Sequence, residues 1–219
     1  PDFLQIDLSN AFHSHPKGSI FRQERITTYG KVFRIYKFRT MVANAEKLGT
    51  QVTVNNDMRV TRIGKFLRKY RLDETPQIFN ILKGDMSFIG HRPKLVKDAI
   101  FYEKEILDQY VMRPGITGYA AAYGRNKNTW EATFEKDKFY NQNVSLWLDI
   151  KIIFKTIGTV FTNKGESHSA SEEDRQNERE QEYYYADYLL RIQKITKEQY
   201  DKGLELSKVL IKDKKRMEF

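Results

Sequence analysis

Two adjacent carboxylates, Asp73 and Glu74, are the side chains in this sequence best placed to carry out chemistry. They follow a strongly basic segment, and Pro76 and an apolar run come directly after them. Because proline is best tolerated in the first turn of a helix, the two acids are predicted to lie at a helix N-terminus. Unpaired N–H groups and partial positive charge make that end suitable for binding phosphate. A simple helix cap at Asp73 is the alternative interpretation.

The basic segment before the two acids is predicted to be an amphipathic helix. Apolar residues recur at i, i+3, i+4 and i+7, the spacing of one helix face: Ile63, Phe66, Leu67 and Tyr70. The remaining surface is basic, with Lys65, Arg68, Lys69 and Arg71. Such a charge run is usually a solvated face. Its position directly before two acids also allows a charged, coupled site.

A β-hairpin is predicted ahead of that helix. Two β-prone runs, residues 20–26 and 32–39, flank a turn signal at residues 27–30. Alternation along the second strand places four side chains on one face: Phe33, Ile35, Lys37 and Arg39. A face that begins apolar and ends cationic suits a strand that leaves a core and approaches an anion. A solvated strand end is the simpler alternative.

The other predicted elements are mainly helices. A short helix after Pro76 ends near Gly84, and a loop follows it. A longer amphipathic helix, broken at residues 113–118, is marked by Leu95, Ala99, Tyr102, Ile106 and Tyr110. Residues 119–125 are predicted as a short strand or loop, and residues 130–139 as a helix.

The most apolar helix is predicted over residues 146–161. It is too short to span a bilayer, and Lys151 and Lys155 interrupt it. Its pattern favours a core helix over a helix that lies in a membrane surface with Trp147 at the headgroup level.

Composition points to an anionic partner. The chain has 219 residues, enough for one domain plus an appendage, and a net charge of +9. A basic balance fits nucleic acid, a phosphorylated substrate or an anionic membrane. There are no cysteines, which excludes disulfides and thiolate chemistry, and the four histidines lack metal-ligand spacing.

A polar linker at residues 163–174 precedes a predicted separate helical hairpin. Two hydroxyl residues stand three positions before Glu or Gln, the pattern of a helix start: Ser169 with Glu172, and Thr196 with Gln199. The chain ends in a basic cluster of Lys212, Lys214, Lys215 and Arg216. This cluster is either a solvated tail or a site attracted to a partner or to anionic lipid.

Six short motifs occur together in one order. They are Lys37-Phe38-Arg39-Thr40-Met41, Asp57…Arg59…Thr61-Arg62-Ile63-Gly64, Leu72-Asp73-Glu74…Pro76-Gln77, Asn80…Leu82…Gly84-Asp85-Met86-Ser87, Gly90…Arg92-Pro93 and Arg113-Pro114-Gly115-Ile116-Thr117-Gly118. In this order and spacing they resemble the bacterial sugar transferases, also called monotopic phosphoglycosyl transferases or undecaprenyl-phosphate sugar phosphotransferases. Each motif alone is weak, but six in order are specific. The resemblance covers residues 20–163.

The resemblance implies an activity at a membrane. Such enzymes move a sugar-1-phosphate from a UDP-sugar onto a polyprenyl (undecaprenyl) phosphate and release UMP, at the cytoplasmic face of the bacterial inner membrane. The product starts O-antigen (lipopolysaccharide), capsule or exopolysaccharide synthesis. Asp73 takes the position of the nucleophile, which forms a covalent phosphosugar intermediate, and Glu74 takes the second position of the dyad. Carboxylate attack on phosphorus gives an acyl phosphate and splits one transfer into two.

The resemblance also implies Mg²⁺, with Asp73 and Glu74 as its candidate ligands. The ion would lower the repulsion between a carboxylate and an anionic diphosphate. Five cationic side chains are candidates for binding phosphates, the arginines with two-pronged geometry: Lys37, Arg39, Arg59, Arg62 and Arg92. Three more residues are candidates for supporting roles: Asp57, Gln77 and Arg125.

Some positions depart from the family pattern. Thr75 stands where leucine is usual, His91 stands where proline is usual, and residues 119–123 differ from the usual continuation. The last difference bears on sugar or nucleotide preference. The family's N-terminal re-entrant helix is largely missing, and residues 1–8 would be its remnant.

The predicted fold is a mainly helical α+β domain, monotopic and membrane-associated, in which amphipathic helices surround a small β-hairpin. Residues 1–19 would be a leader or the remnant of a membrane segment, residues 20–163 the catalytic domain, and residues 164–219 a linker and helical C-terminal extension. The extension could contact a second copy or an assembly partner.

Two alternatives remain open at this point. One is a non-enzymatic basic module that binds nucleic acid or an anionic membrane, with Tyr and Phe side chains stacking on bases. The other is a family scaffold that lost its lipid anchor and acts in assembly. The transferase itself is expected to bind no nucleic acid.

Overall fold

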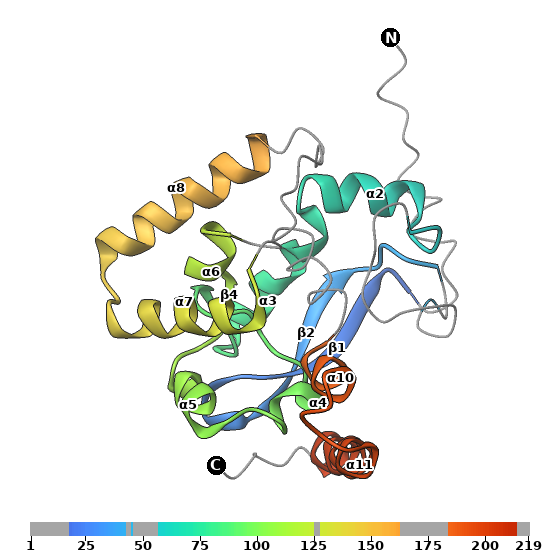
Figure 1. Cartoon of the computed structure of the whole chain (residues 1–219). Coiled ribbons are helices and arrows are strands. Elements are labelled where there is room, and N and C mark those ends of the chain that lie inside the picture. Colours follow the sequence, from blue (N-terminus) through green and yellow to red (C-terminus); the bar gives the residue numbers. More distant parts are fainter. Residues whose placement is uncertain (1–17, 43–44, 46–56, 125–127, 163–183, 214–219) are drawn as a thin grey trace.

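The computed structural model describes residues 18–42, 45, 57–124, 128–162 and 184–213. This part of the chain is mainly helical with two two-stranded sheets, which confirms the predicted α+β class (Figure 1). No helix within it is both long and apolar enough to cross a membrane. The segment predicted as a leader or membrane remnant is residues 1–19, and its first 17 residues lie outside the described part of the chain.

The predicted hairpin is present. Strands β1 (Ile20–Ile26) and β2 (Val32–Phe38) pair antiparallel and are joined through the 3-10 helix η1 (Thr28–Gly30). Both apolar residues on the predicted face of β2, Phe33 and Ile35, are buried. The face therefore begins in the core, as the alternation predicts.

Three helical pieces follow the hairpin: α2 (Arg62–Lys69), the 3-10 helix η3 (Leu72–Gln77) and α3 (Ile78–Leu82). Arg71 takes a left-handed conformation with φ 57°, which ends α2 and turns the chain into η3. The two acids lie in the first turn of a helix, as predicted, but this helix has 3-10 rather than α geometry and Pro76 lies inside it rather than in its first turn.

A second strand pair lies where loops are predicted. β3 (Ser87–Ile89) and β4 (Gly115–Thr117) pair in parallel. Their flanking segments approach closely, because a Cβ added at Gly118 would overlap the carbonyl oxygen of Gly90. The glycines of the two motifs therefore allow the motifs to lie directly against each other.

The prediction of one long amphipathic helix after residue 93 is wrong, because the helix is not continuous. Three short pieces replace it: α4 (Val96–Ala99), α5 (Lys104–Leu107) and the 3-10 helix η4 (Asp108–Val111). Most of the residues that mark the pattern are nevertheless buried, namely Leu95, Ala99, Tyr102 and Tyr110.

The next helices give mixed outcomes. A short helix, α6 (Tyr119–Ala122), replaces the predicted strand or loop, and α7 (Trp130–Gln142) confirms the predicted helix. Helix α8 (Leu146–Thr162) is also present, but its interpretation as a core helix is wrong. Ile152 is fully buried, whereas large apolar side chains are exposed: Leu146, Trp147, Ile153, Phe154 and Ile157. The reason is that α6 and β4 cover only part of α8, which lies at the edge of the molecule (Figure 1).

The C-terminal helices α10 (Tyr185–Arg191) and α11 (Lys197–Asp213) lie beside α4 (Figure 1). They are helical as predicted, but they are not a separate hairpin, because α10 is part of the main core. That core consists of Ile26, Val96, Ala99, Tyr102, Tyr110, Phe134, Tyr185 and Leu189.

The predicted start of the last helix is confirmed. Thr196 N donates to Gln199 Oε1 at 2.8 Å, and Gln199 N donates to Thr196 Oγ1 at 3.2 Å. The other predicted helix start, at Ser169, the linker and the basic residues 214–216 lie outside the described residues.

Candidate active site

Lys37 and Glu74 meet where β2 ends against η3. The Lys37 Nζ atom lies 2.8 Å from Glu74 Oε1. Asn80, which is completely buried on α3 directly after η3, joins α3 to β2: its Nδ2 donates to Arg34 O at 2.7 Å, and its Oδ1 accepts from Tyr36 N at 3.0 Å. The cationic end of the β2 face is thereby held against the acid pair.

Glu74 is an anion held by two cations. Its Oε1 also lies 3.4 Å from Nη2 of Arg92, whose side chain is 58% exposed. Burial by itself raises the pKa of Glu74, but the charges of Lys37 and Arg92 outweigh burial and lower this pKa to about 2. Glu74 therefore stays ionised at neutral pH.

Asp73 has a different electrostatic environment. Burial raises the pKa of the Asp73 carboxyl, and the charge of Glu74 raises it further, while Lys37 and Arg68 oppose the increase. The adjacent acids are thus shifted in opposite directions, as in sites where two carboxylates take different roles. Asp73 is the more basic of the two and so the better candidate for a nucleophile.

Arg68 reaches this site because α2 lies close to the end of the hairpin. A Cβ added at Gly64 would overlap the carbonyl oxygen of Thr40, so glycine permits the approach. Thr61 caps the helix by accepting a hydrogen bond from Gly64 N at 2.9 Å. Arg68 Nε then donates to Thr40 Oγ1 at 2.8 Å. Its guanidinium is partly buried and interacts electrostatically with Asp73.

Asp57 and Arg59 form an ion pair with each other. Arg59 Nη2 lies 2.6 Å from Asp57 Oδ2, and this hydrogen-bonded arginine lowers the pKa of Asp57 to about 2. Arg59 Nη1 also donates to Ala45 O at 3.1 Å, and Arg59 O accepts from Val42 N at 2.9 Å. The structure thus places both residues in contacts that hold the segment after β2, and the phosphate-binding role of Arg59 and the supporting role of Asp57 remain predictions.

The remaining candidates are placed as follows. Arg39 Nε donates to Gly18 O at 2.9 Å, Arg62 is exposed at the start of α2, and Gln77 is buried at the end of η3. Arg125 lies outside the described residues. The candidates that the structure brings together are Lys37, Asp73, Glu74 and Arg92.

Two arginines that are not among the predicted site residues, Arg68 and Arg25, also act electrostatically on this site. The sequence leaves the basic face that carries Arg68 open as either a solvated face or part of a charged, coupled site, because helical periodicity does not show which partner a polar face meets. Arg25 donates from Nη1 to Pro93 O at 3.0 Å, and burial together with the charge of Arg92 lowers the pKa of Arg25 to about 10. In the hairpin, Arg25 lies opposite Phe33, which is on the same face of β2 as Lys37. The cross-strand pairing predicted from the sequence could therefore have placed Arg25 on that face.

A family model supports the assignment of the chain. The model described as bacterial sugar transferase matches residues 3–163. The chain belongs to the bacterial sugar transferase family. The matched range contains the acid pair and every cation described above.

Individual relatives in this family act on sugar nucleotides or remain uncharacterized. A UDP-N-acetylgalactosamine-undecaprenyl-phosphate N-acetylgalactosaminephosphotransferase from Aeromonas hydrophila is 44% identical over 156 residues, which are 68% of this chain and 37% of that protein. A UDP-glucose:undecaprenyl-phosphate glucose-1-phosphate transferase from Escherichia coli (strain K12) is 42% identical over 161 residues, 69% of this chain and 34% of that protein. The uncharacterized sugar transferase EpsL of Bacillus subtilis (strain 168) is 39% identical over 145 residues, 66% of this chain and 71% of that protein. The chain therefore spans well under half the length of the first two relatives.

The acid pair also fits the donor set that magnesium ions use in proteins. Among the described residues there is no group of three or more His, Cys, Asp or Glu side chains that could hold a metal. Mg²⁺, however, is usually held by one or two carboxylates, with substrate phosphate oxygens and water completing its shell. Asp73 and Glu74 can supply such carboxylates.

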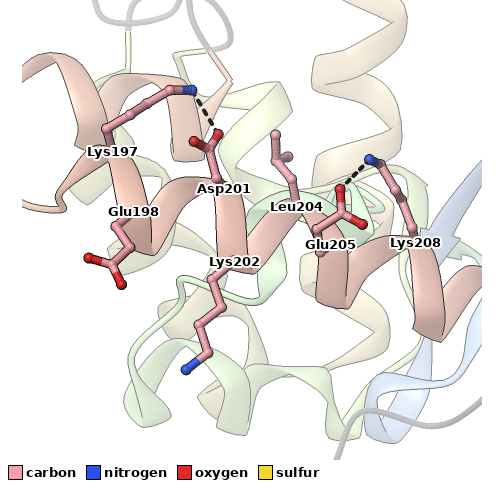
Figure 2. Close-up of a pocket in the computed structure, with 7 residues that line it drawn as sticks. All are labelled: Lys197, Glu198, Asp201, Lys202, Leu204, Glu205 and Lys208. Atoms are coloured by element: carbon pink, nitrogen blue, oxygen red, sulfur yellow. Dashed lines mark hydrogen bonds and ion pairs between the residues drawn. The ribbon is translucent and has the colours of Figure 1, made fainter.

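A surface hollow on α11 does not resemble a transferase site. Figure 2 shows that the side chains lining it all come from this one helix. Its charges are largely paired among themselves, with Lys197 Nζ 2.7 Å from Asp201 Oδ1 and Lys208 Nζ 2.6 Å from Glu205 Oε1. We therefore place the candidate active site at the acid pair.

Proposed function

We propose that this family member moves a sugar-1-phosphate from a UDP-sugar to undecaprenyl or another polyprenyl phosphate and releases UMP. The names of the Aeromonas and Escherichia relatives support this pairing of donor and acceptor. The observation that carries the proposal is the divergence of two adjacent acids. Asp73 has a raised pKa, while Glu74 is held as an anion by Lys37 and Arg92.

In the first half-reaction, a carboxylate oxygen of Asp73 attacks the β-phosphorus of the UDP-sugar. An oxygen–phosphorus bond forms to Asp73, the bond from this phosphorus to the bridging oxygen breaks, and UMP leaves with the electron pair. Arg68 and Arg92 would neutralise charge on the phosphates, since phosphoryl transfer depends mainly on positioning and electrostatics. Mg²⁺, when bound, would supply further neutralisation.

In the second half-reaction, an oxygen of the polyprenyl phosphate attacks the same phosphorus. The bond to Asp73 breaks, which regenerates its carboxylate and yields a polyprenyl diphosphate sugar. Glu74 remains an anion throughout, and Lys37 and Arg92 keep it in place beside the nucleophile. The product would begin the synthesis of exopolysaccharide, capsule or O-antigen.

We further infer that the reaction takes place at the cytoplasmic face of the bacterial inner membrane, because the acceptor is a membrane lipid. Helix α8 supports this location. Its Trp147 and Phe154 side chains are 75% and 71% exposed, and Lys151 and Lys155 are exposed on the same helix. Exposed apolar side chains combined with cations suit a helix that lies in the headgroup region of an anionic membrane.

The proposal is tested by following UMP release from a panel of UDP-sugars in the presence of Mg²⁺ and undecaprenyl phosphate. Asp73→Asn should lower the rate at least about a thousandfold, because an amide cannot form the intermediate. Glu135→Gln, a matched loss of charge at an exposed position, should leave the rate unchanged. Full UMP release by a folded Asp73→Asn protein would remove Asp73 from the mechanism.

Intact-mass measurement adds a direct observation of the intermediate. Wild-type protein incubated with donor and Mg²⁺ alone should gain the mass of the sugar phosphate, and Asp73→Asn should not. An adduct of equal amount on the variant would place the covalent bond at another residue.

A further inference from the structure

Residues 91–99, here called the arginine segment, are buried except at two positions. Arg92 is exposed and Lys97 is half-buried, while the other side chains of the segment are buried. Arg92 meets Glu74 at 3.4 Å near one end of the segment. Lys97 lies near the other end, where α4 contacts the C-terminal helices.

Strand β1 holds the middle of the arginine segment. Ile26 N donates to Lys94 O at 3.1 Å, and Arg25 Nη1 donates to Pro93 O at 3.0 Å. Leu95 forms an isolated β-bridge with Arg25. A close-packed segment of this kind transmits a displacement along its length, because its neighbours leave little room for local rearrangement.

Helix α10 holds the far end of the arginine segment. Lys97 Nζ lies 3.0 Å from Asp187 Oδ2, and Asp98 Oδ1 accepts a hydrogen bond from Ala186 N at 3.1 Å. Asp187 also accepts a hydrogen bond from the Tyr200 hydroxyl, so α11 is joined to the same carboxylate. Asp98 and Ala186 are buried, which shields the hydrogen bond between them from water.

Aromatic contacts complete the attachment of α10. The Tyr185 ring centroid lies 5.0 Å from that of Tyr102, 5.4 Å from that of Trp130 and 5.5 Å from that of Phe134. All of these partners belong to residues 3–163, the range that the family model matches, whereas α10 and α11 lie beyond it. The extension is therefore joined to the transferase core by both apolar and charged contacts.

We propose that the extension formed by α10 and α11 positions Arg92 against Glu74, acting through the arginine segment. Asp187 is a positioning residue in this arrangement, since it contacts Lys97 and Tyr200 and no residue of the acid pair. The inference rests on the proposed function to the extent that Arg92 serves the transfer. It assigns a task to a part of the chain that the family model does not cover.

Hydrogen exchange of the full chain tests the structural half of the proposal. Asp187→Ala should speed exchange of the amides of Asp98 and Ala99 about tenfold, as expected when a charge-assisted contact is lost. Asp201→Ala is the matched control, because it removes an exposed ion pair of the same extension. Asp187→Asn keeps the shape of the side chain and serves if Asp187→Ala does not fold. Equal exchange in the Asp187 and Asp201 variants would overturn the proposal.

A double-mutant cycle on UMP release tests the link to Arg92. Asp187→Ala should lower kcat/KM about tenfold in the wild-type background but by less than about twofold when Arg92 is already alanine. If the two losses simply multiply, Asp187 does not act through Arg92 and the proposal fails. If the wild-type chain releases no UMP from any donor, the proposed function fails, while the exchange experiment still decides whether the extension holds the arginine segment.

Discussion

The Lys37 ammonium lies 2.8 Å from the Glu74 carboxylate, and the two side chains are only 19% and 11% exposed. This contact joins β2 to η3 across 37 residues of sequence. Removing one partner of a buried ion pair leaves an uncompensated charge, so the contact matters for stability as well as for the site.

Replacing Lys37 with methionine should therefore destabilise the protein. We expect Lys37→Met to lower the free energy of unfolding by about 3 kcal/mol, because Glu74 then stays buried beside a single, largely exposed cation. Urea denaturation at neutral pH measures the change. Lys83→Met, which removes an exposed lysine that donates to the Tyr36 hydroxyl, should cost less than about 1 kcal/mol. Equal losses in the two variants would contradict the buried-pair interpretation.

Two glycine substitutions should have effects of opposite sign. Gly64→Ala should destabilise the protein by about 2 kcal/mol or more, because its Cβ would overlap Thr40 O and push α2 away from the hairpin. Gly158→Ala, on α8, meets open space and should stabilise that helix by up to about 1 kcal/mol. Thermal unfolding of both variants checks the pair, and a neutral Gly64→Ala would disprove the close approach that brings Arg68 to Asp73.

We expect the free energy of unfolding to rise at mildly acidic pH because of two buried carboxyl groups. Burial raises the pKa of Asp98 and of Asp137 to about 6, above the usual value of about 3.9 for an unfolded chain. Their contribution is therefore fully present below about pH 4 and is lost as the pH rises through about 6. Asp137→Asn should remove about 2 kcal/mol of the rise between about pH 7 and pH 4.5.

Urea denaturation across this pH range measures the effect, with Asp201→Asn as an exposed control. Below about pH 4.5 the trend should reverse, because the pKa values of Asp57 and Glu74 are lowered to about 2. The stability contributed by these two carboxylates is fully present above the pKa values that they have in the unfolded chain, and it is lost as the pH falls towards 2. An Asp137→Asn protein with the wild-type pH dependence would contradict the assignment.

Charge on the exposed face of α8 should weaken membrane binding. Phe154→Asp should lower the affinity for vesicles that contain anionic lipid at least about tenfold. The reason is that burial of an aromatic ring in the membrane contributes about 1.5–3 kcal/mol to binding. Flotation of the full chain measures the bound fraction. Leu206→Asp introduces the same charge at an exposed apolar position on α11 and should have little effect. A similar loss in both variants would point to net charge rather than to α8.

The local order of the site was determined by the sequence alone. Alternation placed Phe33, Ile35 and Lys37 on one face, and Pro76 placed the two acids in a first helical turn. Both patterns depend on residues within a few positions of each other, so they persist whatever the rest of the chain does. The same holds for the helix start at Thr196.

The tertiary structure decided which partner each of these elements meets. Helical periodicity showed that α8 has an apolar side, but only the placement of α6 and β4 determined that most of this side is exposed. The sequence pattern around Arg68 is that of any solvated arginine. Its contact with Thr40 forms only because Gly64 allows α2 to approach this residue. The docking of α10 on α4 likewise depends on contacts nearly ninety residues apart. Burial and charge pairing depend on two surfaces that meet in space. The periodicity of a sequence describes the surface of a single element and does not show which other element packs against it.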